Sequence, residues 1–426
     1  MSSHSSIHHL NPSFYFATQG LLTAATVLLT NKKSPSRLIP LVLVLALGIL
    51  ELRTAADNAG PNGGAVATFA FLYTAQLANL LCVTSVSLLD FTAFQSNARK
   101  LSPGQKIRLV LHLVAFNFRG IRTPWQIKNV PPFSDYFPGR LPRSRITFMG
   151  RQILIMAFQY LIADLVTARM STLTGRQRDH LFGPGTEFAY FSATRQQWYF
   201  RIVSSIVIRW CLQRAFLSFF YNLSSIAGVA TSLFSIEDFP PFMGSVWSSY
   251  TLRGYWGQHW HQTLRWPLTS LSTFITRDIL DLPKPSLLER YTHIFLVFSM
   301  SGFLHVFIDI GDGKSEFLST MLYFQSFALG IMMEDGVQAL WRWYTGQPFI
   351  ENDDAVHVWK KIVGFMWVNF FFVMVEPWYC YPAARLPQRD RKNLPVGVSS
   401  YIGEGFTYVL TCALGLILLT VFKVEV

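Results

Sequence analysis

The sequence predicts an all-α protein, a polytopic bundle of about eight or nine transmembrane helices, and three observations predict it. Half of the 426 residues are hydrophobic (51%), and the mean hydropathy is positive at +0.30. Only 14% of the residues are charged, whereas a soluble domain usually has about 25%. Several apolar runs are also long enough to cross about 30 Å of hydrocarbon as helices. Much of the protein surface is therefore expected to face the lipid bilayer.

Each of these apolar runs should be a helix, because backbone groups at membrane depth must form their hydrogen bonds internally. The runs are Asn11–Thr30, Leu38–Leu52, Val66–Leu89, Thr147–Val166, Ile202–Leu223, Ile294–Ile310, Leu318–Trp341, Ile362–Cys380 and Tyr401–Phe422. Two of them are irregular, since Leu38–Leu52 is short and Ile202–Leu223 carries Arg209 and Arg214. The weak alternating pattern of a membrane β-barrel is absent.

The cysteines and the basic residues limit the classes of cofactor and partner. The four cysteines lie apart, without metal-ligand or redox spacing, so we expect no disulfide scaffold or metal site. We also expect no tightly bound cofactor. Residues 99–151 contain eleven Lys or Arg and a single acid, Asp135. This basic region would contact anionic lipid or help to gather a polyanion such as coenzyme A. Because it lies between membrane spans, nucleic-acid binding is not predicted.

The chain shows no internal repeat and no low-complexity segment, which indicates a single polytopic membrane domain over residues 1–426. The absence of repeats weighs against many secondary transporters, which are built from repeated halves. One segment, Ser235–Arg290, is neither apolar enough to cross the membrane nor polar enough to be a free loop. It is rich in Trp and Tyr with His and Arg among them, and such rings prefer the membrane–water interface. We expect this segment to lie along the interface.

The first candidate site lies in this aromatic segment. If Thr251–Leu264 is helical, residues four apart share a face. That arrangement would form a stripe of Gly257, His261 and Arg265, with Trp256 and Trp260 beside it. Gly257 would leave room for a ligand or another backbone next to His261. His259 would point elsewhere and is poorly placed to share a metal with it. An interfacial aromatic belt with ordinary histidines is the alternative interpretation.

The second candidate site is an ionisable residue deep in an apolar run. His305 lies one helical turn after Ser301 and one turn before Asp309, so the three share a face. Ionisable residues in membrane helices usually face a protein interior or a cavity. A histidine is also the natural general base for an alcohol proton. The alternatives are a packing histidine bonded to Ser301 and an Asp309 that caps the helix rather than orienting the imidazole.

Together these segments resemble the membrane-bound O-acyltransferase superfamily, in particular its wax synthase-like branch in fungi. Members carry Arg-x-[Tyr/Phe]-Trp-Gly-x-x-Trp-[His/Asn], followed by Ser-Gly-x-x-His in a membrane helix. Here the motifs read Arg253-Gly-Tyr-Trp-Gly-Gln-His-Trp-His261 and Ser301-Gly-Phe-Leu-His305. Weaker matches lie at Arg119–Trp125 and Gly330–Asp335. The resemblance places a catalytic region at residues 235–345.

The resemblance implies acyl transfer from an acyl-CoA to a hydroxyl group in a cavity within the bilayer. His305 would be the catalytic histidine. His261 stands where many members have Asn, and would donate a hydrogen bond to the thioester oxygen or position the acceptor. Substrate contacts would come from Arg253, Trp256, Gly257, Trp260, Ser301 and Asp309, with Arg253 pairing with a CoA phosphate or anchoring at lipid headgroups. We expect the two histidines to meet in one chamber.

The resemblance further implies acetyl-CoA as the donor and a hydrophobic terpenoid or meroterpenoid alcohol as the acceptor. The setting would be secondary-metabolite biosynthesis at the endoplasmic reticulum membrane. A long-chain wax ester synthase is the alternative within the family. A transporter with a His-lined pathway would show repeated halves, and a membrane terpene cyclase would need deep acidic residues where this chain has a histidine. The oligomeric state stays open.

Overall fold

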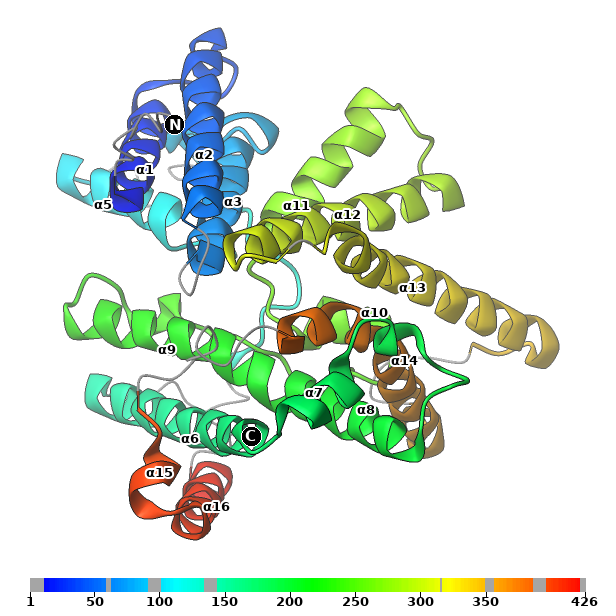
Figure 1. Cartoon of the computed structure of the whole chain (residues 1–426). Coiled ribbons are helices and arrows are strands. Elements are labelled where there is room, and N and C mark those ends of the chain that lie inside the picture. Colours follow the sequence, from blue (N-terminus) through cyan, green and yellow to red (C-terminus); the bar gives the residue numbers. More distant parts are fainter. Residues whose placement is uncertain are drawn as a thin grey trace, which may run out of the picture. The chain divides into compact units, whose positions relative to one another are not determined.

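The computed structural model describes residues 11–58, 63–90, 101–133, 144–314, 316–348, 356–385 and 396–421. Across these ranges the chain is helical and has no strand (Figure 1), which confirms the predicted all-α class. The chain forms two compact units. The first comprises Met1–Ile127 and Thr263–Ala328, and the second comprises Lys128–Gln262 and Leu329–Val426. The expectation of one domain over residues 1–426 stays a prediction.

The first unit contains the N-terminal helices and the helix that carries His305. Its elements are α1 (Pro12–Leu29), η1 (Pro35–Arg37), α2 (Leu38–Asp57), α3 (Gly63–Ala78), η2 (Asn79–Val83), α5 (Pro103–Ala115), α11 (Arg265–Thr273), η10 (Phe274–Ile279) and α12 (Leu287–Gly311). Side-chain caps begin several of them, such as Asn11 at α1 and Ser286 at α12. Helix α3 packs against α2 and α12, and α1 packs against α2 and α5 (Figure 1).

Glycine on both helices allows α3 and α12 to approach closely. A Cβ on Gly63 would lie 2.1 Å from the carbonyl oxygen of Gly311, and a Cβ on Gly311 would lie 2.6 Å from the carbonyl carbon of Gly63. Small residues permit such backbone contact between membrane helices. The contact holds the start of α3 against the end of the helix that carries His305.

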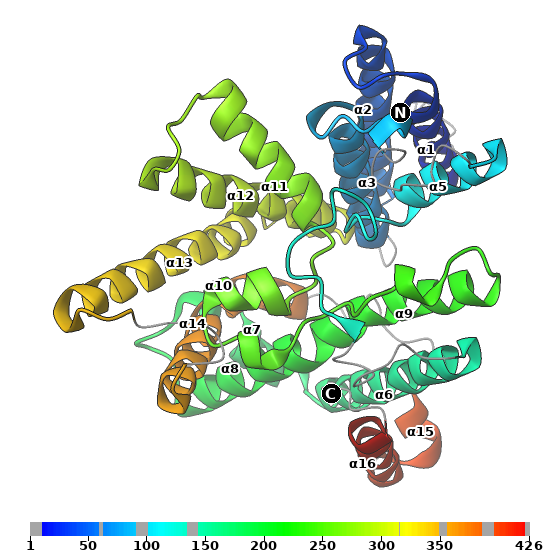
Figure 2. The ribbon, with the colours of Figure 1, turned by 180° about the vertical axis from the view of Figure 1, so that it is seen from behind.

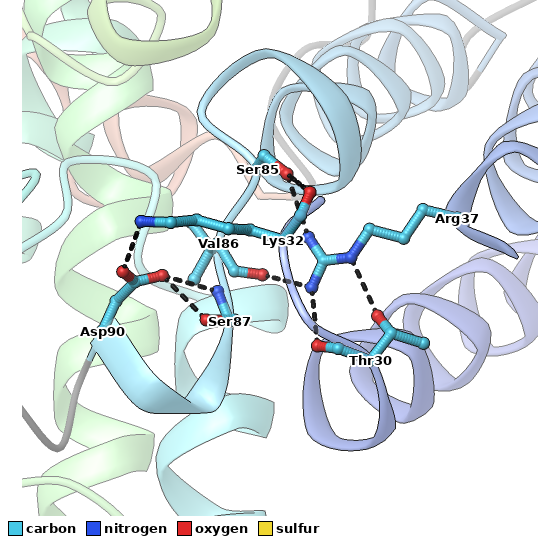
Figure 3. A network of polar contacts seen from close by, with 7 residues as sticks. All are labelled: Thr30, Lys32, Arg37, Ser85, Val86, Ser87 and Asp90. Carbon is cyan, nitrogen blue, oxygen red and sulfur yellow. Dashed lines mark hydrogen bonds and ion pairs between the residues drawn. The ribbon is translucent and has the colours of Figure 1, made fainter. Parts of the chain in front are cut away.

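A polar network ties the turn between α1 and α2 to the segment that follows α3 (Figure 3). Arg37 is 2% exposed, and its guanidinium donates to the hydroxyl of Thr30 at 2.8 Å and to the carbonyl of Val86 at 2.8 Å. Lys32 forms an ion pair with Asp90 at 2.9 Å in the same network. Arg37 is therefore a structural residue whose buried charge is compensated by oxygen atoms.

The second unit contains the aromatic segment and the C-terminal helices. Its elements are α6 (Arg145–Ser171), α7 (Gly175–Phe182), η5 (Thr186–Phe188), α8 (Arg195–Val207), η6 (Ile208–Gln213), α9 (Arg214–Ala230), η7 (Ile236–Asp238), η8 (Val246–Ser248), α10 (Leu252–Gly254), η9 (Tyr255–His259), α14 (Val358–Arg385), α15 (Val398–Ile402) and α16 (Glu404–Val421). Helix α6 packs against α9 and α16, and α8 packs against α14 (Figure 2). Helix α13 (Phe317–Thr345) begins in the first unit and ends in the second.

Seven helical segments in the described part of the chain are long and apolar enough to cross a membrane. They are Pro35–Asp57, Gly63–Val83, Arg145–Ser171, Arg195–Ala230, Leu287–Gly311, Val358–Arg385 and Glu404–Val421. Both irregular runs of the sequence are among them. The runs expected at Asn11–Thr30 and Leu318–Trp341 form the helices α1 and α13. The mean hydropathy of these two helices is lower than that of the seven segments. Polar side chains such as Gln19 in α1 and Glu334 in α13 account for the difference.

Candidate active site

His305 lies near the C-terminal end of α12, on one face with Ser301 and Asp309. Its Nδ1 is 2.7 Å from the backbone carbonyl oxygen of Ser301. A carbonyl oxygen only accepts hydrogen bonds, so Nδ1 carries the proton of the neutral ring and Nε2 keeps its lone pair. The contact with Ser301 that the alternative interpretation expects is present, but it goes to the backbone carbonyl rather than to the hydroxyl. This tautomer is the one that a general base needs at Nε2.

Packing against α13 holds the His305 ring in place. Its centroid lies 4.2 Å from that of Phe324. Gly302 leaves room for side chains of α13, since a Cβ there would lie 2.8 Å from the sulfur of Met321 and 3.4 Å from Cβ of Phe324. The Ser-Gly-x-x-His pattern therefore has a physical basis in this structure. The carbonyl of Ser301 sets the tautomer of His305, and the missing side chain of Gly302 leaves room for side chains of the neighbouring helix.

Asp309 has partners other than the imidazole. One carboxylate oxygen lies 3.1 Å from the ammonium of Lys314, and the other accepts a hydrogen bond from the hydroxyl of Thr320 at 2.6 Å. Asp309 thus ties the end of α12 to the segment that follows it and to α13. The interpretation in which Asp309 orients His305 is not supported by these contacts.

The helix considered over Thr251–Leu264 is interrupted, so the stripe of Gly257, His261 and Arg265 is wrong. After α10 the chain forms the π-helix η9, and Trp260 is extended (φ −65°, ψ 147°). The reason is that the last helical carbonyls accept hydrogen bonds from groups outside the helix. The amide of Gln262 donates to the carbonyl of Trp256 at 3.1 Å, and the backbone N–H of Gly244 donates to that of His259 at 2.8 Å.

His261 follows this bend and stacks on Phe242, with ring centroids 5.3 Å apart and planes within 1°. A Cβ on Gly257 would meet no atom of the described residues within 4 Å, and the expectation that this room adjoins His261 stays a prediction. His259 turns elsewhere, since its Nδ1 lies 3.0 Å from the carbonyl oxygen of Gly244. Burial, together with the positive charge of Arg214, lowers the pKa of His259 to about 4. His259 is therefore neutral at physiological pH.

The two tryptophans of the first motif belong to one aromatic cluster. Trp256 and Trp260 lie with ring centroids 5.8 Å apart, and Trp260 stacks on Tyr255 at 5.7 Å. Trp256 also packs against Phe372 of α14 at 6.4 Å. Such aromatic contacts fix ring positions beyond the effect of burial alone. They hold the segment that ends in His261 against α14.

The segment Gly330–Asp335, which matches the family only weakly, contacts the start of the motif Arg253–His261. Glu334 accepts hydrogen bonds from the backbone N–H groups of Leu252 at 2.5 Å and Arg253 at 3.2 Å, at the start of α10. Asp335 forms an ion pair with Arg253 at 2.8 Å. A carboxylate at the first N–H groups of a helix satisfies donors that have no helical partner. Arg253 is thus held by the protein itself.

The structure does not test the expected catalytic and substrate-binding roles of the site residues, nor the expected meeting of the two histidines. His305 belongs to the first unit and His261 to the second, and their meeting in one chamber stays a prediction. Among the residues that the structure describes, no group of three or more His, Cys, Asp or Glu side chains is placed to hold a metal ion.

Comparison with known proteins identifies the class. Residues 239–326, which include both histidine motifs, match the family described as "Membrane bound O-acyl transferase family". The chain is 36% identical to the acetyltransferase TRI7 of Fusarium sporotrichioides, over 83% of this chain and 81% of that protein. It is 34% identical to the acetyltransferase atnC of Arthrinium sp, over 96% and 95%. Identity to the acetyltransferase pyr8 of Aspergillus fumigatus is 41%, over 67% of each chain. No solved structure matches.

The chain therefore belongs to the membrane-bound O-acyltransferase family. It is a multi-pass membrane O-acetyltransferase, with helices long enough to span the bilayer. Membership of this family implies an acyl-CoA cosubstrate and an acceptor for the acyl group. These conclusions agree with the resemblance drawn from the two histidine motifs.

Proposed function

We propose that the protein transfers an acetyl group from acetyl-CoA to a hydroxyl group of a lipophilic terpenoid or meroterpenoid. The reaction would belong to secondary-metabolite biosynthesis at the endoplasmic reticulum membrane. The names of the similar proteins, which are acetyltransferases, support acetyl as the group transferred. A hydrophobic acceptor is supported by the position of His305 in a helix long and apolar enough to span the bilayer. No tightly bound cofactor is needed for this chemistry.

In the proposed mechanism His305 is the general base. Its Nε2 takes the proton of the acceptor hydroxyl while the oxygen attacks the thioester carbonyl carbon. The tetrahedral intermediate then collapses, the carbon–sulfur bond breaks, and the imidazolium returns its proton to the thiolate of CoA. His261 donates a hydrogen bond to the oxygen that becomes negative, the kind of contact that lowers such barriers. The observation that supports the role of His305 as general base is the bond from its Nδ1 to the carbonyl of Ser301, which leaves Nε2 as the basic nitrogen.

The test is acetyl transfer by microsomes that contain the wild type or a His305 variant. With radiolabelled acetyl-CoA and hydroxylated terpenoids, His305→Ala and His305→Gln should lower kcat by a factor of about 100 or more, because a positioned base contributes that much. His293→Asn is the matched control, since His293 lies in the same helix and bonds Ser272 of α11 at 3.0 Å. It should retain most of the activity.

Near-normal turnover by His305→Ala would remove this residue from the mechanism. The same assay with a series of acyl-CoAs separates acetyl transfer from wax ester synthesis. A preference for long acyl chains would contradict the proposed donor.

A further inference from the structure

Two charged side chains lie buried within apolar helices of the second unit, and the proposed mechanism does not use them. Arg209 in η6 and Glu376 in α14 are each 1% exposed. Helix α8, which leads into η6, packs against α14 (Figure 2). One carboxylate oxygen of Glu376 accepts a hydrogen bond from the hydroxyl of Ser205 at 2.6 Å. Ionisable residues at membrane depth are costly and usually serve function.

The guanidinium of Arg209 is only partly bonded. Its Nη2 donates to Oδ1 of Asn369 at 3.2 Å, and this oxygen also accepts from the indole N–H of Trp210 at 3.2 Å. Its Cζ lies 3.9 Å from the centroid of the Phe372 ring. Within the described part of the chain, Nε and Nη1 have no hydrogen-bond partner. Buried donors without a partner are costly, so a ligand or water is expected beside them.

Tyr255 brings a third polar group to the same position. It is completely buried, and its hydroxyl has no hydrogen-bond partner among the described residues. Its ring contacts Phe372 at 4.9 Å and Trp210 at 5.9 Å, the two rings that flank the guanidinium of Arg209. Glu376 lies one helical turn after Phe372 in α14, on the same face of that helix. Oε1 of Glu376 likewise has no partner across the described ranges.

The unbonded atoms define the chemistry of a ligand. The guanidinium of Arg209 offers donors, the carboxylate of Glu376 offers an acceptor, and the hydroxyl of Tyr255 can act as either. A phosphate or carboxylate does not fit, because the carboxylate of Glu376 would repel its negative charge. A metal cation does not fit either, because the guanidinium of Arg209 would repel its positive charge. An amide presents a carbonyl oxygen and an N–H group together and satisfies both sides. The pantetheine arm of an acyl-CoA carries such amides, and one is joined to the thioester sulfur by a short ethylene link.

We propose that Arg209, Tyr255 and Glu376 bind an amide of the pantetheine arm of acyl-CoA. This inference rests on the proposed use of an acyl-CoA. The motif supports it, since Tyr255 stacks on Trp260 at 5.7 Å, and the ring of Trp260 lies 5.3 Å from that of His261. An arm bound at Tyr255 would extend its thioester toward the residue proposed to bind the thioester oxygen. Both η6 and η9 are π-helices, which often occur at functional sites.

The test measures binding and turnover by the full-length protein in detergent. Arg209→Met should weaken the binding of acetyl-CoA and of free pantetheine by about 10-fold to 100-fold, the usual effect of losing hydrogen bonds to a charged group. Tyr255→Phe and Glu376→Gln should weaken both by smaller factors. The KM for the acceptor should not change. A simple alkyl thiol, which lacks the amide, should bind the wild type and the variants equally.

Arg201→Met is the matched control. Arg201 is 2% exposed in α8, its Nη2 donates to the carbonyl of Thr186 at 2.7 Å, and its Cζ lies 4.8 Å from the ring centroid of Tyr190. Its loss should lower thermal stability without weakening pantetheine binding. If Arg209→Met does not fold, pantetheine binding by Tyr255→Phe alone tests the proposal. This variant removes a single hydroxyl and should leave the fold intact.

Two results would overturn the proposal. The first is equal binding of pantetheine by the wild type and the Tyr255 and Arg209 variants, which would leave only water at the site. The second is a rise in the KM for the acceptor with unchanged pantetheine binding, which would assign the site to the acceptor. A wild type that binds pantetheine but transfers no acetyl group would instead contradict the proposed function.

Discussion

The His261 side chain is held by stacking rather than by a regular helix. Its ring lies parallel to that of Phe242 and next to that of Trp260, and the extended conformation of Trp260 directs the chain out of η9. A flat ring in this position can present a nitrogen to a substrate oxygen. The side chain of Asn, which the resemblance places at this position in many members, is shorter but also donates a hydrogen bond.

We predict that His261→Asn keeps partial activity. The amide can still donate to the thioester oxygen, so kcat should fall by about 10-fold, whereas His261→Ala should lose about 100-fold or more, as expected for loss of an oxyanion donor. Turnover of labelled acetyl-CoA at saturating acceptor measures both. Complete loss in His261→Asn at normal expression would mean that the imidazole transfers a proton.

The identity of the motif residues could be predicted from the sequence, but their partners could not. Arg253 was expected to meet a CoA phosphate or lipid headgroups, and it pairs with Asp335. Asp309 was considered as a partner of His305, and it binds Lys314. Residue spacing describes only contacts within one helix. The pairing of Arg253 with Asp335 depends on how α10 and α13 pack.

The local geometry of the helices could also be predicted only in part from the sequence. The length of the apolar runs predicted the long helices, but it gave no sign of the π-helices η6 and η9. A π-helix changes the direction of the side chains that follow it, which is why the stripe through Gly257 and His261 was wrong. The end of η9 is set by contacts with Gly244, which is distant in the sequence.

The contact between α3 and α12 provides a prediction about stability. Gly311→Ala should separate the two helices, because its Cβ would lie 2.6 Å from the backbone of Gly63. Since the backbone cannot easily yield, we expect a loss of about 2 kcal/mol or more and a fall in melting temperature of roughly 5 °C. Thermal unfolding of the purified protein in detergent measures the change.

Gly150→Ala is the matched control for this variant. Gly150 lies inside α6, and a Cβ there would meet no atom of the described residues within 4 Å. Alanine should therefore be neutral or slightly stabilising, by up to about 1 kcal/mol. An unchanged melting temperature in Gly311→Ala would show that α3 and α12 have more space than the structure indicates.

For the whole molecule, the central question is whether the two histidines act in one step. We predict that His305→Ala combined with His261→Ala loses little more activity than the more damaging single variant, because residues that act as a unit are strongly non-additive. Measurement of kcat/KM for the wild type, both single variants and the double variant tests this. Losses that multiply would place the two residues in independent steps.

The sequence by itself determined the class of this protein. Long apolar runs can satisfy their backbone groups in a bilayer only as helices, and two short motifs carried the family resemblance. The tertiary structure decided which buried groups meet, such as Arg209 with Asn369 and Glu376 with Ser205. The physical reason is that hydrophobic periodicity tells which face of a helix is apolar. It does not tell which polar atoms of distant helices come within hydrogen-bonding distance.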